Sequence, residues 1–209
     1  MEEYLNEKEQ WERVLAWLRE QGPWILAGVA VAVAAFGGWR YWQNRTQQRN
    51  LAAATRYEQV IDAFSRNDVG GGVRLADELV KAFPSTVYAD QANLAVARIQ
   101  VESKQLDQAA TRLQQALAST KDAELALIAR LRLARVQLAQ GKADDALKTL
   151  DAAKPGAFAA RYAEVRGDAL LAKGDRDGAL KAYREARGNG GSTLDTGLLD
   201  LKIGELARS

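Results

Sequence analysis

A pattern of small residues recurs along most of the chain and constrains its fold more than any other feature. The equivalent positions are predicted to be Ala76, Ala109, Ala146 and Ala179, spaced by 33, 37 and 33 residues. A period of about 34 residues is typical of units that each consist of two antiparallel helices. Small side chains at these positions let the two helices of one unit approach closely. Several such units must stack, because one unit alone cannot bury its apolar face.

The unit between residues 166 and 186 shows the pattern most completely. Gly167 marks the place where its first helix crosses the second, and Gly174 marks the turn between them. The second helix then carries Ala179, Tyr183 and Ala186. This spacing resembles the tetratricopeptide repeat, although alanine stands at the position where that repeat usually has tryptophan.

Glycine and proline divide the remainder of the chain into helices of 10–18 residues. The predicted breaks fall at residues 70–72, 84–85, 141, 155–156, 174 and 188–191. The first unit, around Gly71 and Ala76, is the most degenerate. Because no run alternates with a period of two for long enough to form a strand, the predicted fold is all-α.

An uncharged apolar segment precedes the repeats. Residues 21–39 carry no charged side chain, and a helix of this length matches the hydrocarbon thickness of a bilayer. Aromatic residues that favour membrane interfaces stand at its two ends, namely Trp24, Trp39, Tyr41 and Trp42. A buried core helix would need a polar face, which this run lacks. A cleaved signal peptide would need a positive n-region, whereas residues 1–20 are net negative. The segment therefore predicts an uncleaved transmembrane helix over residues 21–42.

Within this segment, small residues repeat every four positions on one helix face, at Ala30, Ala34 and Gly38. Such a stripe lets two membrane helices approach closely. An alanine-rich segment also produces this pattern by chance, so both interpretations stay open.

The segments that flank the predicted membrane helix differ in charge. Residues 1–20 form a tail, and its residues 4–20 have the pattern of a short amphipathic helix. This helix is interpreted either as a solvated tail that becomes helical near the bilayer or as a docking face for a partner. Residues 43–56 form a basic juxtamembrane helix, and residues 57–209 form the repeat domain. That domain carries 22 basic and 21 acidic residues. This balance argues against nucleic-acid binding, which requires a basic surplus on the folded domain.

The composition excludes several kinds of chemistry. The chain contains neither cysteine nor histidine, so thiol nucleophiles, zinc sites with these ligands and histidine general bases are unavailable. The glycine-rich stretch at 69–72 lacks the Lys-Ser/Thr of a phosphate-binding loop. We therefore predict no catalytic residue, no cofactor and no metal, and a protein that is not an enzyme.

Stacked helical hairpins curve into a surface that can hold an extended peptide or a partner helix. The ninth position of each first helix usually faces this groove, and here it is occupied by Arg98, Arg135 and Asp168. These residues are predicted to contact a partner. The alternative is that they are ordinary solvated charges.

Together these motifs resemble the YfgM family, the ancillary subunits of the SecYEG translocon in Gram-negative bacteria. The resemblance is carried by residues 38–42, 131–137, 146–151 and 166–175, in this order and spacing. It covers the whole chain and is least clear over residues 50–85.

The resemblance implies a single-pass inner-membrane protein that associates with the translocon and with PpiD, a membrane-anchored periplasmic chaperone, and that assists newly exported client proteins. It also implies a cytoplasmic N-terminus and a periplasmic repeat domain. Basic residues near the membrane segment number three on its N-terminal side and four on its C-terminal side, which slightly favours the opposite orientation. We follow the family because this difference is one charge. The alternative function is an envelope scaffold or cell-division tether that acts by protein–protein interaction.

Overall fold

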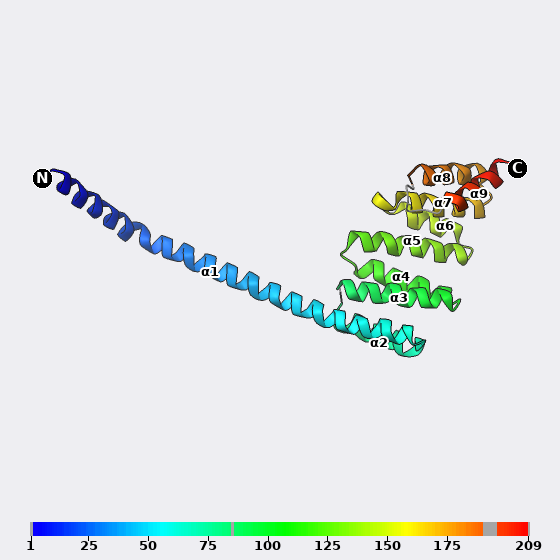
Figure 1. Ribbon diagram of the computed structural model, residues 1–209, viewed down its shortest axis with the longest axis horizontal. Helices are drawn as coiled ribbons and strands as arrows, with labels where there is room; N and C mark the ends of the chain where they lie inside the picture. The colour runs from blue at the N-terminus through cyan, green and yellow to red at the C-terminus, as the bar shows by residue number, and fades with distance from the viewer. Residues whose placement is uncertain (1, 85, 190–195, 209) are drawn as a thin grey trace. The chain divides into compact units, whose positions relative to one another are not determined.

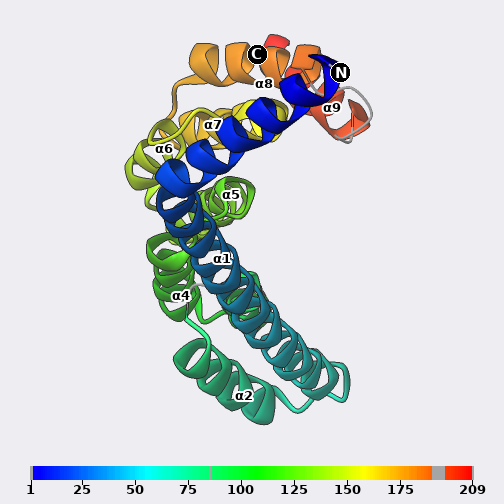
Figure 2. The same cartoon turned by 90° about the vertical axis from the view of Figure 1, so that its left-hand side faces the viewer.

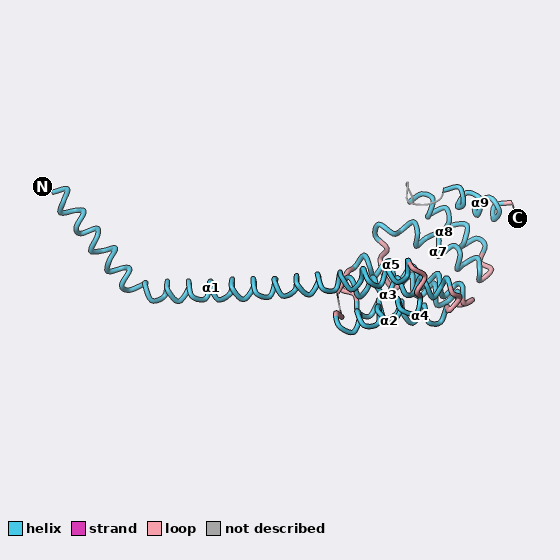
Figure 3. Tube along the Cα trace, turned by 60° about the horizontal axis from the view of Figure 1, so that its bottom comes forward, coloured by secondary structure: helices cyan, strands magenta, loops and turns pink. Residues whose placement is uncertain are grey.

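The computed structural model describes residues 2–84, 86–189 and 196–208, with the side chains of residues 2–10, 18 and 25 outside that description. Within this part every regular element is a helix (Figure 3), which confirms the predicted all-helical repeat class. The helices are α1 (Glu2–Ser65), α2 (Val69–Ala82), α3 (Val87–Glu102), α4 (Leu106–Ser119), α5 (Ala123–Ala139), α6 (Ala143–Asp151), the 3₁₀ helix η1 (Gly156–Phe158), α7 (Ala159–Ala172), α8 (Arg176–Asn189) and α9 (Thr196–Ala207). The chain divides into two units, residues 1–49 and 50–209.

The first unit lies within α1. The predicted boundaries after residues 20, 42 and 56 all fall inside this helix. Its segments Trp11–Trp24 and Leu26–Ser65 are bent by 41°. Pro23 explains a bend here, because its ring lacks an N–H group and collides with the carbonyl one turn earlier.

Among the described residues, no single helix is long and apolar enough to cross a membrane alone, and the two bent segments meet that requirement only together. The transmembrane helix over residues 21–42 therefore stays a prediction.

The second unit is a stack of helical hairpins. The end of α1 packs with α2, and α3 with α4, α5 with α6 and α7 with α8 follow in order (Figure 1). In Figure 2 the stack curves, with α4 and α6 on its outer side and α5 on its inner side. Helix α9 is unpaired and packs on α8, where it covers the end of the stack. A repeat array needs such a cap, because its last apolar face would otherwise meet water.

The turns inside the hairpins share one backbone feature. A residue with positive φ lies two positions after the last residue of each first helix, namely Asn67, Lys104, Gly141 and Gly174. The second helix begins two residues later, in α2, α4, α6 and α8. The two glycine turns were predicted from the sequence, and no break was predicted at Asn67 or Lys104, because asparagine and lysine are weaker turn signals than glycine.

The shared turn corrects the alignment of the first unit. Counted from the turn, the position of Ala109, Ala146 and Ala179 is occupied in α2 by Gly72, and Ala76 lies one helical turn later. The true spacings are therefore 37, 37 and 33 residues. A Cβ on Gly72 would lie 2.3 Å from Cε1 of Phe64, so a side chain at this crossing would require the phenyl ring to shift.

The predicted break at residues 70–72 is also wrong. These glycines form the first turn of α2, because Asp68 caps the helix by accepting a hydrogen bond from the Gly71 N–H at 2.8 Å. The predicted breaks at 84–85 and 188–191 lie partly outside the described residues.

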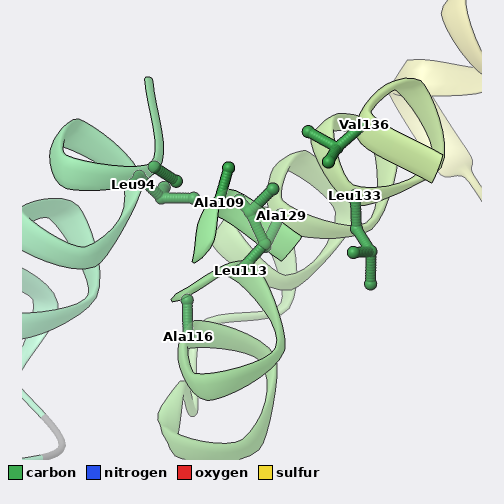
Figure 4. Close-up of a cluster of buried hydrophobic side chains, with 8 residues drawn as sticks. Leu94, Ala109, Leu113, Ala116, Ala129, Leu133 and Val136 are labelled. Atoms are coloured by element: carbon green, nitrogen blue, oxygen red, sulfur yellow. The ribbon is translucent and has the colours of Figure 1, made fainter. Parts of the chain in front are cut away.

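The alanines of the repeat pattern are buried where the helices cross. Ala76, Ala109, Ala146 and Ala179 are all fully buried, as predicted. Figure 4 shows one of the resulting clusters, in which Leu94 of α3, Leu113 of α4 and Leu133 of α5 meet around small residues. Three of the clusters join helices of two successive units, and the fourth joins the last hairpin to α9. Burying apolar surface therefore links the units as well as stabilising each of them.

Candidate binding groove

A pocket of about 460 Å³ opens between α3 and α5. Its apolar lining consists of Ala97, Val101, Leu106, Leu113, Val136 and Ala139. Most of these side chains belong to the first helices of two successive units, and Leu106 and Leu113 belong to α4. The pocket has the size of small-molecule or side-chain binding sites, and its apolar lining favours an apolar occupant.

Arginine side chains surround this pocket. Arg98 and Arg135, two of the residues predicted to contact a partner, both line it. Arg98 Nε donates to Glu102 Oε1 at 2.8 Å on its own helix, and a nitrogen of Arg135 lies 3.8 Å from Glu164 Oε2 of α7. The structure therefore brings together two side chains that are 37 residues apart in the sequence.

Arg132 is a third arginine of the same pocket, which sequence analysis missed. It donates to the Leu94 carbonyl oxygen at 3.4 Å. Burial lowers the pKa of its guanidinium, and the positive charges of Arg98 and Arg135 lower that pKa further. The signal that could have found it is its position three residues before Arg135, since residues three apart share a helix face.

Asp168 lies outside this pocket. Its Oδ1 accepts hydrogen bonds from the Tyr183 hydroxyl and from Lys202 Nζ, both at 2.7 Å. Lys202 belongs to α9 and also lies 3.4 Å from Glu164 Oε1 and 5.2 Å from the centre of the Tyr183 ring. Burial and the neighbouring carboxylate raise the pKa of Tyr183 well above its usual value of 10.0. The acidic groups of α7 are thus engaged by the chain itself.

The residues predicted to serve the membrane segment are all exposed in α1. Ala30, Ala34 and Gly38 lie on one helix face, and a Cβ on Gly38 would meet no atom within 4 Å. The aromatic side chains of Trp24, Trp39, Tyr41 and Trp42 are exposed as well. Contact with a second helix or with a bilayer interface stays a prediction for these residues.

The described residues form no group of three or more acidic side chains that could hold a metal ion. The groove offers charged and apolar contacts to a macromolecular partner. Guanidinium groups beside an apolar pocket bind by ion pairing and burial.

Stacked hairpins with a pocket lined by their first helices define a tetratricopeptide-like repeat protein. The family model described as a tetratricopeptide repeat-like domain matches residues 15–208. Two solved structures share this fold. A crystal structure of MamA is 19% identical with a TM-score of 0.55, covering 72% of this chain and 84% of that one. MamA from Desulfovibrio magneticus RS-1 is 15% identical with a TM-score of 0.55, covering 75% and 89%. At these identities the likeness concerns the fold alone.

Proteins named ancillary SecYEG translocon subunit are similar over almost the whole chain. The protein of Escherichia coli (strain K12) is 36% identical over 207 residues, which cover 99% of this chain and 100% of that protein. Those of Aggregatibacter actinomycetemcomitans and Haemophilus influenzae are 32% and 30% identical over 202 residues, covering 97% of this chain and 98% of each. The chain belongs to the family of ancillary SecYEG translocon subunits, as the resemblance of its sequence predicted.

Proposed function

We propose that this protein is an ancillary component of the Sec translocon that acts by binding and positioning other proteins. In this proposal α1 anchors the repeat domain in the bacterial inner membrane, with the N-terminus in the cytoplasm and the repeats in the periplasm. The groove around Arg98, Arg132 and Arg135 contacts a membrane-anchored chaperone of the PpiD kind or a newly exported client. No chemical step is assigned to the protein.

The observation that carries this proposal is the pocket between α3 and α5, because it combines an apolar lining with three guanidinium groups in a family whose members are named for the translocon. Its lining residue Val101 is 40% exposed. Side chains of this kind are available for a partner.

The predicted membrane anchor supports the proposal because it would raise the local concentration of the repeat domain beside other membrane proteins. Residues 21–39 carry no charge and their aromatic neighbours are exposed. A tether of this kind keeps the groove close to other membrane proteins, so contacts that are individually weak suffice for association. The second candidate function, an envelope scaffold or cell-division tether, would use the same anchor and the same groove, with the small-residue stripe at Ala30, Ala34 and Gly38 supporting self-association.

Site-specific photocrosslinking in living cells tests this function. We expect a benzoylphenylalanine at Val101, in the pocket, to crosslink to a translocon subunit, a membrane-anchored chaperone or an exported chain. The same probe at Gln114, which is exposed on α4 at the outer side of the curve, is the matched control and should not. Replacing both Arg98 and Arg135 by glutamate should reduce the Val101 crosslinks and leave the helical circular dichroism unchanged.

Two outcomes would contradict the proposal. Crosslinks from Gln114 but never from Val101 would show that the pocket is not the contact surface. If crosslinks formed only between copies of this chain, the scaffold function would have to replace the proposed translocon function. In the same cells, alkaline phosphatase fused after Ser209 should be active, and an inactive but stable fusion would reverse the proposed orientation.

A further inference from the structure

The charges on the first helices are distributed unevenly between neighbouring parts of the groove. On α7, Glu164 and Asp168 are both engaged by Lys202 of α9 at 3.4 and 2.7 Å. On α5, Arg132 has the Leu94 carbonyl as its hydrogen-bond acceptor and forms no ion pair within the described residues. Arg135 also approaches Glu164 at 3.8 Å, so the two carboxylates of α7 are balanced by Lys202 and Arg135 together, and Arg132 is left as the basic surplus beside the pocket.

We propose that this pocket binds a segment of a partner protein in which a carboxylate lies close to an aliphatic side chain. The inference rests on the proposed binding function and names the chemistry of the bound segment. The aliphatic side chain occupies the apolar lining, and the carboxylate pairs with Arg132 and its neighbours Arg98 and Arg135.

The apolar part of this assignment follows from the pocket itself. Its volume of about 460 Å³ accommodates more than one aliphatic side chain, and Val101 exposes 40% of its surface there. Leu113 and Val136 form deeper, almost fully buried parts of the lining. Covering this surface removes apolar area from water, which is the largest favourable contribution available to a partner.

The charged part follows from the rim. Three arginines line the pocket, and two of them are paired within the chain: Arg98 with Glu102 at 2.8 Å and Arg135 with Glu164 at 3.8 Å. Arg132 therefore carries the surplus positive charge of the rim. Burial and two like charges already make the charged form of Arg132 less favourable, and an incoming carboxylate would offset this. Planar guanidinium groups bind carboxylates with two parallel hydrogen bonds.

A protein carboxylate fits this rim better than a phosphate group of a lipid. The apolar lining lies directly beside the guanidinium groups, so one short peptide segment can satisfy both. A lipid headgroup would satisfy the arginines and leave the pocket unfilled.

The test is a selection of random dodecapeptides displayed on phage, performed on the full-length chain in detergent micelles. A parallel selection uses the variant in which Arg98, Arg132 and Arg135 are all replaced by glutamine. We expect peptides recovered on the unmodified chain alone to be enriched in aspartate or glutamate close to leucine, isoleucine or valine. The most enriched peptide is then synthesised, together with a copy in which glutamine or asparagine replaces each acidic residue, and binding is measured by fluorescence anisotropy.

For that peptide, Arg132→Gln should raise Kd about ten-fold, the effect of losing one charge-assisted hydrogen bond at a partly exposed site. Ala139→Phe should abolish binding. Ala139 is exposed at the pocket, so a phenyl ring at this position fills the pocket without entering the core. Arg184→Gln on α8 is the matched control and should leave Kd unchanged. Circular dichroism confirms that each variant is folded.

Equal binding of the acidic peptide and its neutral copy would overturn the proposal, as would selected peptides that lack acidic residues or bind equally to Ala139→Phe. Displacement of the peptide by phosphatidylglycerol vesicles, with vesicle binding that requires Arg132, would assign the pocket to a lipid headgroup instead. These measurements use purified protein without a translocon, so their failure would leave the crosslinking result for the proposed function intact.

Discussion

Replacing Gly167 by alanine is expected to lower the free energy of unfolding of the repeat domain by about 3 kcal/mol. A Cβ at this position would lie 2.5 Å from Cδ1 and Cε1 of the Tyr183 ring, far inside van der Waals contact. The ring cannot move aside, because it is fully buried and its hydroxyl group donates to Asp168 at 2.7 Å. Urea denaturation followed by circular dichroism measures the change, with the midpoint shifting at constant slope.

Gly204→Ala is the matched control for this substitution. Gly204 lies inside α9, and a Cβ there would meet no atom within 4 Å. Alanine should therefore stabilise the helix slightly, by about 0.5–1 kcal/mol, because it restricts the unfolded chain without a steric penalty. If both substitutions changed stability by the same amount, the close crossing of α7 and α8 at Gly167 would be wrong.

Replacing Leu199 by alanine is expected to cost about 3 kcal/mol, the usual effect of removing a buried leucine side chain. Leu199 is 1% exposed and packs with Ala179 and Tyr183, so α9 loses the contact that fixes it to the end of the stack. Because α9 packs on the last hairpin only, the loss should appear mainly as local opening. Hydrogen exchange should accelerate about 100-fold in the amides of residues 196–207 and stay unchanged in α3 and α5.

Leu201→Ala is the control on the same helix. Leu201 is 67% exposed, so its truncation should change exchange in α9 by less than about three-fold. Equal acceleration by both variants would indicate that α9 is not held through Leu199. Opening of α9 also withdraws Lys202 from Glu164 and Asp168, which links the cap to the charge of the groove.

The class of fold could be predicted from the sequence because its cause is local and periodic. Small residues recur at the spacing of a helical hairpin, and Gly141 and Gly174 mark turns that need a positive φ. The same spacing placed Ala109, Ala146 and Ala179 correctly at buried crossings. Membership of the family could be predicted for a related reason. Several short motifs in the same order and spacing are specific together, even when each motif alone is weak.

The first unit was aligned incorrectly because its sequence allows two alignments. Glycine at 72 followed by alanine one turn later offers two small residues for the crossing position, and the structure places Gly72 there, against Phe64 of α1. The turn at Asn67 decides between them, and its positive φ is visible only in the structure.

The residues of the candidate groove could likewise be predicted only in part. The ninth positions predicted Arg98 and Arg135, because residue spacing determines which side of a helix a residue occupies. Tertiary structure alone decided that these two share a pocket with Arg132, and that Asp168 belongs to a separate network with Lys202 and Tyr183. Arg98 and Arg132 are 34 positions apart, as are Asp168 and Lys202, and Lys202 belongs to an end cap outside the repeat pattern. Helical periodicity carries no information about packing between elements so distant in the chain.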